Sequence, residues 1–205
     1  MPINIAADII DITTDTPLET DNFFVDSNVW YWVGYTNASV TARHNQSTDY
    51  PNYLSQCLLN AANLLNCALS FPELAHIIER TEREIFEQIN QTTISPKNFR
   101  HNYPTERQQV VTEIQNVWAL IELMTNNQTI PLNVDDQAVS AALTSLTSLA
   151  LDGYDLFMLD AILQAGITQV ITDDSDFGQV SGIQVFTSNQ RLIQTAKTQG
   201  QLVKR

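Results

Sequence analysis

Short apolar runs alternate with longer segments of helical periodicity along this chain. Three runs are rich in β-branched or aromatic residues and end in polar ones, which is typical of buried strands. They cover residues 22–27, 169–172 and 183–187. Two weaker strand candidates are 67–71 and 129–134, the latter with a proline that favours a strand start or a sheet edge.

Apolar residues at helical spacing fill most of the segments between these runs, most regularly in 105–124. Helices are predicted over 53–66, from Pro72 to about 90, over 105–124, from Asp135 or Asp136 to about 149, over 155–165, and from Ser188 to near Gly200. Strands that alternate with helices predict an α/β fold with a parallel sheet covered on both faces.

No internal repeat or long linker divides the chain, so we expect one domain over residues 22–205. Residues 1–21 are acidic and weakly periodic, which indicates an added edge strand or a loose arm. The segment around 91–127 is expected to be a helical insertion.

Charge limits what the chain can bind. Its 205 residues contain 23 Asp and Glu against 10 Lys and Arg, a net charge of −13. Such a chain repels phosphate overall, so any nucleic-acid contact must be local or bridged by metal ions. There is no run of 18 apolar residues and no secretory signal, so we expect a cytoplasmic protein without a membrane span. Two cysteines and three scattered histidines indicate neither a disulfide framework nor a zinc site.

The acidic residues have few basic neighbours. Ten carboxylates and no Lys or Arg lie between Arg107 and Arg191. Two carboxylates about 4 Å apart repel by roughly 4 kcal/mol at an effective dielectric constant of 20. A divalent cation or protonation of one group would remove that repulsion.

Several of the acids fall where parallel strands end or helices begin. Asp26 closes the first strand, Asp174 and Asp176 follow the strand at 169–172, Asp155 opens a helix, and Glu73 lies in the first turn of another. Ligands of open parallel sheets bind at the carboxyl ends of the strands. Carboxylate oxygens without His or Cys favour Mg²⁺ or Mn²⁺, and such a site suits phosphodiester hydrolysis.

Four fragments in this order, FFVDSNVW, LSFPELAHII, LDGYDLFMLDAILQAG and TDDSDF, resemble the acidic motifs of the PIN-domain family. These are metal-dependent nucleases that include the toxins of many bacterial toxin–antitoxin pairs. The resemblance implies a three-layer α/β/α fold with a central, mostly parallel five-stranded sheet, one or two Mg²⁺ or Mn²⁺ ions, and single-stranded RNA as substrate. It implies catalytic and metal-binding roles for Asp26, Glu73, Asp155 and Asp174, an auxiliary metal-binding role for Asp176, and flanking polar roles for Asn28 and Thr172.

Basic and aromatic residues interleave in segment 97–107. Its basic members are Lys97, Arg100 and Arg107, with Phe99, His101 and Tyr103 between them. This composition can hold phosphates and stack bases, so the three basic residues are candidates for RNA binding. The alternative interpretation is a polar loop whose aromatic rings pack inward, or a surface that docks a protein partner.

The sequence thus favours a metal-dependent endoribonuclease acting on single-stranded RNA, either free-standing or inhibited by a protein partner. A homodimer is expected. The alternative is a catalytically weak PIN-like module that acts through RNA or a protein partner, or the toxin half of a toxin–antitoxin pair. An aspartyl phosphatase is disfavoured, because the first strand ends in Asp26-Ser27-Asn28 rather than D-x-D and no well-placed Lys follows.

Overall fold

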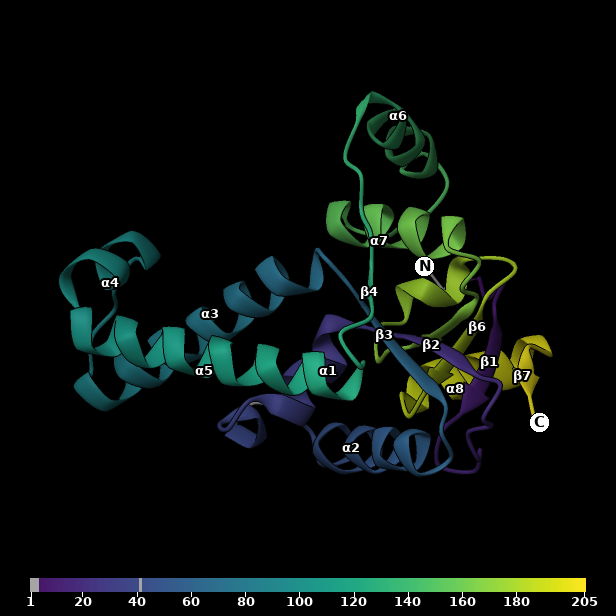
Figure 1. Cartoon of the computed structure of the whole chain (residues 1–205), viewed down its shortest axis with the longest axis horizontal. Helices are drawn as coiled ribbons and strands as arrows, with labels where there is room; N and C mark the ends of the chain where they lie inside the picture. Colours follow the sequence, from purple (N-terminus) through teal and green to yellow (C-terminus); the bar gives the residue numbers. More distant parts are fainter. Residues whose placement is uncertain (1–3, 41) are drawn as a thin grey trace.

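A single parallel sheet forms the centre of the molecule (Figure 1). The computed structural model describes residues 4–40 and 42–205. Within them, seven strands follow the order β4-β3-β2-β5-β6-β1-β7, and every neighbouring pair is parallel. The strands are β1 Asp8–Asp11, β2 Asn22–Val25, β3 Asn63–Cys67, β4 Thr129–Ile130, β5 Gln169–Ile171, β6 Gln184–Thr187 and β7 Leu202–Val203.

Helices cover both faces of this sheet, as predicted. Alternate strand residues point to opposite sides, so Phe23 and Val25 join one hydrophobic core while Phe24 joins the other. The first core is closed by α1 (Ser27–Gly34), α2 (His44–Leu59), α3 (Ser70–Asn90) and α5 (Pro104–Met124). The second is closed by α7 (Gly153–Gln164) and α8 (Gln190–Gln199). Short 3₁₀ helices lie at Ala38–Val40 (η1) and Asp176–Gln179 (η2).

The N-terminal segment contributes a strand to the interior of the sheet. β1 pairs with β6 on one side and with β7 on the other. Residues 8–11 therefore form a strand rather than a loose arm, but the expected edge position is wrong, because the two-residue β7 covers this strand. The expectation of five strands is also wrong, since β1 and β7 bring the sheet to seven.

The region around residue 60 differs from its predicted course. The helix expected over 53–66 ends at Leu59, Ala61 adopts a positive φ of 57°, and the next strand is Asn63–Cys67 rather than 67–71. Leu64 and Leu65 fit a helical stripe and a buried strand equally well. Pairing with β2, where Leu64 lies opposite Phe23, selects the strand.

Two segments project from the sheet (Figure 1). The antiparallel pair α3 and α5 forms a long arm with α4 (Pro96–Asn102) near its tip, and a small core at the tip contains Ile94, Phe99 and Val110. The second projection carries α6 (Asp136–Ser145) between β4 and α7. No helix of the described residues is long and apolar enough to cross a bilayer.

Candidate active site

Asp26 occupies the carboxyl end of β2, where the chain turns directly into α1. Its backbone N–H donates to the carbonyl of Ile171 at 3.0 Å, which continues the pairing with β5. Its side-chain Oδ2 accepts hydrogen bonds from Thr172 Oγ1 and from Asn28 Nδ2, both at 2.6 Å. The two polar residues implied by the family resemblance therefore contact the first acid and fix its orientation.

Asp174 stands beside this group, after β5. Its backbone N–H donates to Thr172 Oγ1 at 2.9 Å, and the N–H of Asp176 donates to Asp174 Oδ1 at 2.8 Å. The intervening sequence neighbour, Asp173, faces elsewhere, because its carboxylate accepts from Tyr50 and Gln46 of α2.

The start of α7 brings two further carboxylates. Asp152 is the N-cap, and its Oδ1 accepts from the N–H groups of Tyr154 at 2.8 Å and Asp155 at 3.0 Å. Asp155 lies in the first turn and is buried. Asp152 is a site residue that the sequence analysis did not single out, although an Asp three residues before another Asp and next to a Gly is typical of a cap followed by a first-turn acid.

Glu73 lies in the first turn of α3, which follows β3. Its Oε2 is buried without a hydrogen-bond partner, and so is the hydroxyl of nearby Ser27. Burial raises the pKa of Glu73; the Ser27 hydroxyl opposes this rise, although the two groups do not meet hydrogen-bond geometry. Asp152 and Asp174 raise the pKa further by charge repulsion.

The pKa values of the most buried acids show that these segments share one environment. Burial first, and then the charge of Glu73, raise the pKa of Asp26 to about 7, against the hydrogen bond from Thr172; Asp174 adds to the rise. Burial raises the pKa of Asp155 to about 9, together with repulsion from Asp26, Asp152, Glu73 and Asp174.

Asp176 belongs to the same group. Burial and repulsion from Asp174 and Asp152 raise its pKa. We call Asp26, Glu73, Asp152, Asp155, Asp174 and Asp176 the acid cluster. It lies where β2, β3 and β5 end, and where parallel sheets commonly bind ligands.

The donor chemistry of the acid cluster fits a hard divalent cation, since all its side-chain donors are carboxylate oxygens. Glu73 Oε2 and Asn28 Oδ1 are buried and have no hydrogen-bond partner, whereas buried polar atoms normally have one. Both oxygens could therefore accept a cation. However, no group of three or more His, Cys, Asp or Glu side chains in residues 4–40 and 42–205 is arranged to hold a metal ion. The acids repel one another but do not stand at ligand geometry.

A groove of about 820 Å³ leads away from the acid cluster. Glu73 and Asp152 line this groove, and so do Arg80, Arg100 and Arg107. Arg100 and Arg107 both pair with the buried Glu79, at 2.7 Å and 2.9 Å. Arg80 was not singled out in the sequence, although its spacing of seven residues from Glu73 puts both on one side of α3.

The structure divides the predicted RNA-binding segment. Arg100 and Arg107 line the groove that holds Glu73, whereas Lys97 lines a separate hollow beside His101. The rings of Phe99 and Tyr103 stack with their centroids 6.1 Å apart, and both contact the ring of Phe86. These rings therefore pack inward at the arm tip. The inward packing of the rings agrees with the alternative interpretation of this segment, but the expected loop is wrong, because α4 and the start of α5 make the segment helical.

No protein-family model matches this chain, and the search of characterised proteins returns no match either.

Proposed function

We propose that this protein is a divalent-metal-dependent endoribonuclease of the PIN-domain type, which hydrolyses phosphodiester bonds of single-stranded RNA. The observation that carries the proposal is the acid cluster. Separate segments after β2, β3 and β5 and at the start of α7 bring buried carboxylates together, and burial first, followed by repulsion between the carboxylates, raises the pKa values of Asp26 and Asp155 to about 7 and about 9. Strongly perturbed carboxylates in a cleft are typical of functional sites.

The strand order supports the same assignment. Without β1 and β7 the sheet reads β4-β3-β2-β5-β6, a five-stranded parallel core whose order reverses between β2 and β5. Crevices at such a reversal point are preferred ligand sites. Asp26 and Asp174 stand at the carboxyl ends of these two strands.

In this proposal Asp26, Asp155 and Asp174 hold Mg²⁺ or Mn²⁺, with Glu73 as a further catalytic carboxylate and Asp176 in an auxiliary role. A bound cation would supply a water of lowered pKa and stabilise the attacking and leaving oxygens. Thr172 and Asn28 hold the Asp26 carboxylate toward the cluster. Arg100 and Arg107 offer local positive charge for phosphates, which a chain of −13 needs.

The test is cleavage of a mixed single-stranded RNA pool with Mg²⁺, Mn²⁺ or EDTA, comparing wild type with Asp174→Asn. We expect metal-dependent cleavage that EDTA abolishes and that the variant loses by roughly a hundredfold or more, since metal-ligand loss removes several kcal/mol of transition-state stabilisation. Asp160→Asn is the matched control, because the Asp160 carboxylate on α7 accepts from Gln164 Nε2 and lies outside the acid cluster. Equal cleavage by wild type and Asp174→Asn would refute the proposal.

One observation favours the alternative of a catalytically weak PIN-like module. The described carboxylates are not arranged as ligands of one ion. If that arrangement persists in solution, the protein should bind single-stranded RNA or a protein partner without metal-dependent cleavage. The assay above separates the two functions, because the alternative predicts RNA binding with no difference between Mg²⁺ and EDTA. An inhibitory partner and a homodimer remain predictions.

A further inference from the structure

Two hollows meet at the acid cluster. The groove with the arginines is the first; the second, of about 470 Å³, lies on the other side of Asp152 and Tyr154, which line both. The remaining lining residues of the second hollow are Leu69, Val134, Gly153 and Phe157. A single-stranded RNA that crosses the acid cluster would therefore meet a basic surface on one side and an apolar, aromatic surface on the other.

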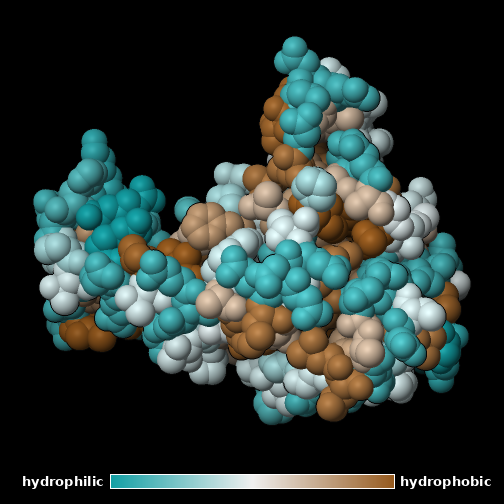
Figure 2. Space-filling model, in the orientation of Figure 1, coloured by the Kyte–Doolittle hydropathy of each residue, from teal (hydrophilic) through white to brown (hydrophobic). Residues whose placement is uncertain are grey.

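The second hollow leaves apolar side chains open to solvent. Tyr154 is 52% exposed and Val134 is 58% exposed. Val134 leads into α6, where Val139 and Leu143 are also exposed, as is Leu146 directly after this helix. Figure 2 shows hydrophobic atoms along the side of this projection that faces the arm. Hollows of this volume with apolar and aromatic walls are typical of small-ligand sites.

We propose that this second hollow, which we call the base pocket, receives a nucleobase next to the phosphate that lies at the acid cluster. The inference rests on the proposed function and adds the element that positions the RNA at the acid cluster, by stacking of a base next to the cleaved bond. Tyr154 adjoins Asp155 in the chain, and its exposed side chain lines both hollows beside Asp152, so a base that flanks the phosphate at the acid cluster can reach its ring. Any base offers a π-face to such a ring, while phosphates on the far side meet Arg80, Arg100 and Arg107.

The charge distribution favours a base over an acidic peptide segment as occupant. Asp152 lines the rim of the base pocket, and Asp155 and Asp176 stand close behind it. These carboxylates repel an acidic peptide, whereas a nucleobase is uncharged and its phosphates can lie in the arginine groove.

Gly153 makes the base pocket testable without disturbing the core. A Cβ at this position would meet nothing within 4 Å, so a larger side chain projects into open space. Gly153 is the first residue of α7, where leucine is a better helix former than glycine. Gly153→Leu should therefore fill the pocket while leaving the fold and the acid cluster in place. Tyr154→Ala removes the stacking ring by a different route.

The experiment measures binding of a short single-stranded RNA in Ca²⁺, which suppresses cleavage, and scans one abasic site along the oligonucleotide. In wild type, one abasic position should weaken binding by roughly 5- to 150-fold, the range of base stacking on an aromatic side chain. Tyr154→Ala and Gly153→Leu should bind the intact RNA more weakly than wild type by the same factor. An abasic site at the sensitive position should then weaken their binding no further. Leu163→Ala, an exposed apolar residue at the other end of α7, is the matched control and should bind as wild type does.

The outcomes separate this inference from the function beneath it. Wild-type binding that is insensitive to every abasic position, or unchanged in both folded variants, overturns the base pocket and leaves the nuclease proposal standing. Binding loss in both variants with a flat abasic scan also overturns it and points to a protein or backbone contact at this surface. If wild type binds no single-stranded RNA, both proposals fall. Melting temperatures equal to wild type establish that Gly153→Leu and Tyr154→Ala are folded.

Discussion

An aspartate stands at each end of β2. The two are equally buried, but their chemical surroundings are opposite. Asp21 precedes the strand and Asp26 follows it, and each is 4% exposed. At Asp21, burial alone would raise the pKa, but hydrogen bonds from Arg205, the Leu18 N–H and Gln169 lower it below its ordinary value. At Asp26, burial and neighbouring carboxylates raise the pKa to about 7.

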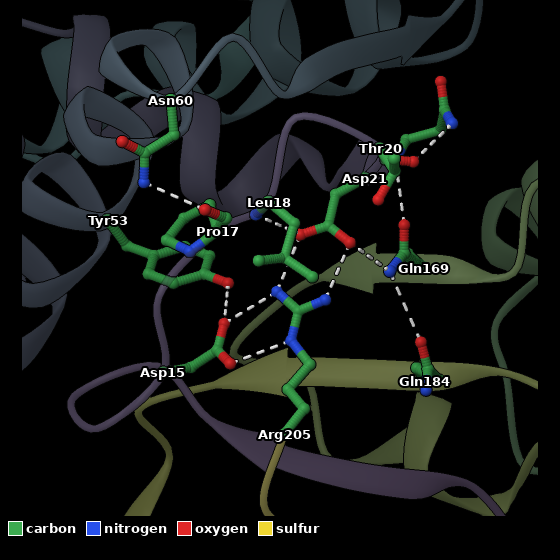
Figure 3. A network of polar contacts seen from close by, with 11 residues as sticks. Asp15, Pro17, Leu18, Thr20, Asp21, Tyr53, Asn60, Gln169, Gln184 and Arg205 are labelled. Carbon is green, nitrogen blue, oxygen red and sulfur yellow. Dashed lines mark hydrogen bonds and ion pairs between the residues drawn. The ribbon is translucent and has the colours of Figure 1, made fainter.

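The arginine accounts for the difference. Arg205 binds Asp15 through Nε at 2.8 Å and Asp21 through Nη1 at 2.7 Å (Figure 3). Its guanidinium carbon also stands 4.5 Å from the centroid of the Phe186 ring. Tyr53 and Gln169 donate to the same two carboxylates. This end of β2 is a satisfied ion-pair network.

Comparison of the two ends suggests how to interpret a buried carboxylate. One that has an arginine partner ties distant segments together, and removal of that partner would leave an uncompensated buried charge. One whose charged neighbours are other carboxylates weakens the metal-free fold, and such an arrangement is characteristic of functional sites. The acid cluster thus differs from the Arg205 network in what it lacks, a positive charge, and a divalent cation would supply one.

Breaking the satisfied end should have the largest effect. Arg205→Ala leaves Asp15 and Asp21 buried without their partner, so we expect a loss of about 3–5 kcal/mol in the free energy of unfolding. Chemical denaturation measures it, and Lys204→Ala, which alters the exposed neighbour, is the control. A loss no larger than that of Lys204→Ala would show that the network does not stabilise the fold.

A divalent cation should supply the positive charge that the acid cluster, at the carboxyl end of β2, lacks. Mg²⁺ or Mn²⁺ at a hundredfold excess over its dissociation constant should stabilise wild type by about 2.7 kcal/mol, since the ion binds the folded state. Thermal melting with and without metal measures the gain. Arg205→Ala should keep the stabilisation by metal, because Arg205 lies at the other end of β2 from the acid cluster. Asp26→Asn should lose most of this stabilisation. A melting temperature unmoved by metal up to ~10 mM, well above the affinities expected of weak Mg²⁺ sites, would indicate a vestigial site.

Neutralising one acid should imitate the cation in part. Asp155→Asn removes a carboxylate whose pKa of about 9 shows that the fold resists its charge. We expect the metal-free protein to gain roughly 1–3 kcal/mol at pH 7 and to lose its response to metal. The control is Asp160→Asn on the same helix, which should leave both quantities unchanged. A destabilised Asp155→Asn would mean that this carboxylate has a structural partner.

The two ends should also respond to pH with opposite signs. The raised pKa values of Asp26 and Asp155 favour the folded state while these groups are protonated. Their contribution to the stability of the metal-free protein is therefore highest below about pH 4. It falls as pH rises through about 7 and about 9. The lowered pKa of Asp21 gives stability that is present above its ordinary value of 3.8 and is lost as pH falls further. Denaturation of Asp155→Asn across this range isolates the first term: its stability should decline less between pH 5 and pH 9, by roughly 1 kcal/mol or more.

The smallest expected effect concerns the groove. Arg100→Gln removes one positive charge beside Glu79. We expect RNA affinity in Ca²⁺ to fall by less than tenfold and the salt slope to drop by about 0.7, the value for one phosphate contact on a single strand. Lys97→Gln, in the separate hollow, should change neither. A larger effect of Lys97→Gln than of Arg100→Gln would move the RNA path to the arm tip.

Much of the site was predictable because strand ends carry their own sequence signature. Asp26 directly follows an apolar run, Asp174 stands three residues after another, and Asp155 stands two residues after a glycine that opens a helix, so their place at one edge follows from a parallel sheet. The contacts of Thr172 and Asn28 with Asp26 match the roles that the family resemblance implied. Asp152 was missed because a capping acid looks the same whether it is solvated or close to other carboxylates.

The sequence by itself determined the alternation of strands and helices, the order of the acids and the absence of basic residues between Arg107 and Arg191, because periodicity and charge are local properties of the chain. Only the tertiary structure decided which acids are compensated. Arg205 reaches Asp21 from 184 positions away, and Glu79 takes up Arg100 and Arg107 of the predicted RNA-binding segment. Likewise, β1 enters the sheet interior through pairing with β6 and β7. Such pairings depend on how distant segments pack, and local pattern carries no record of a partner so far along the chain.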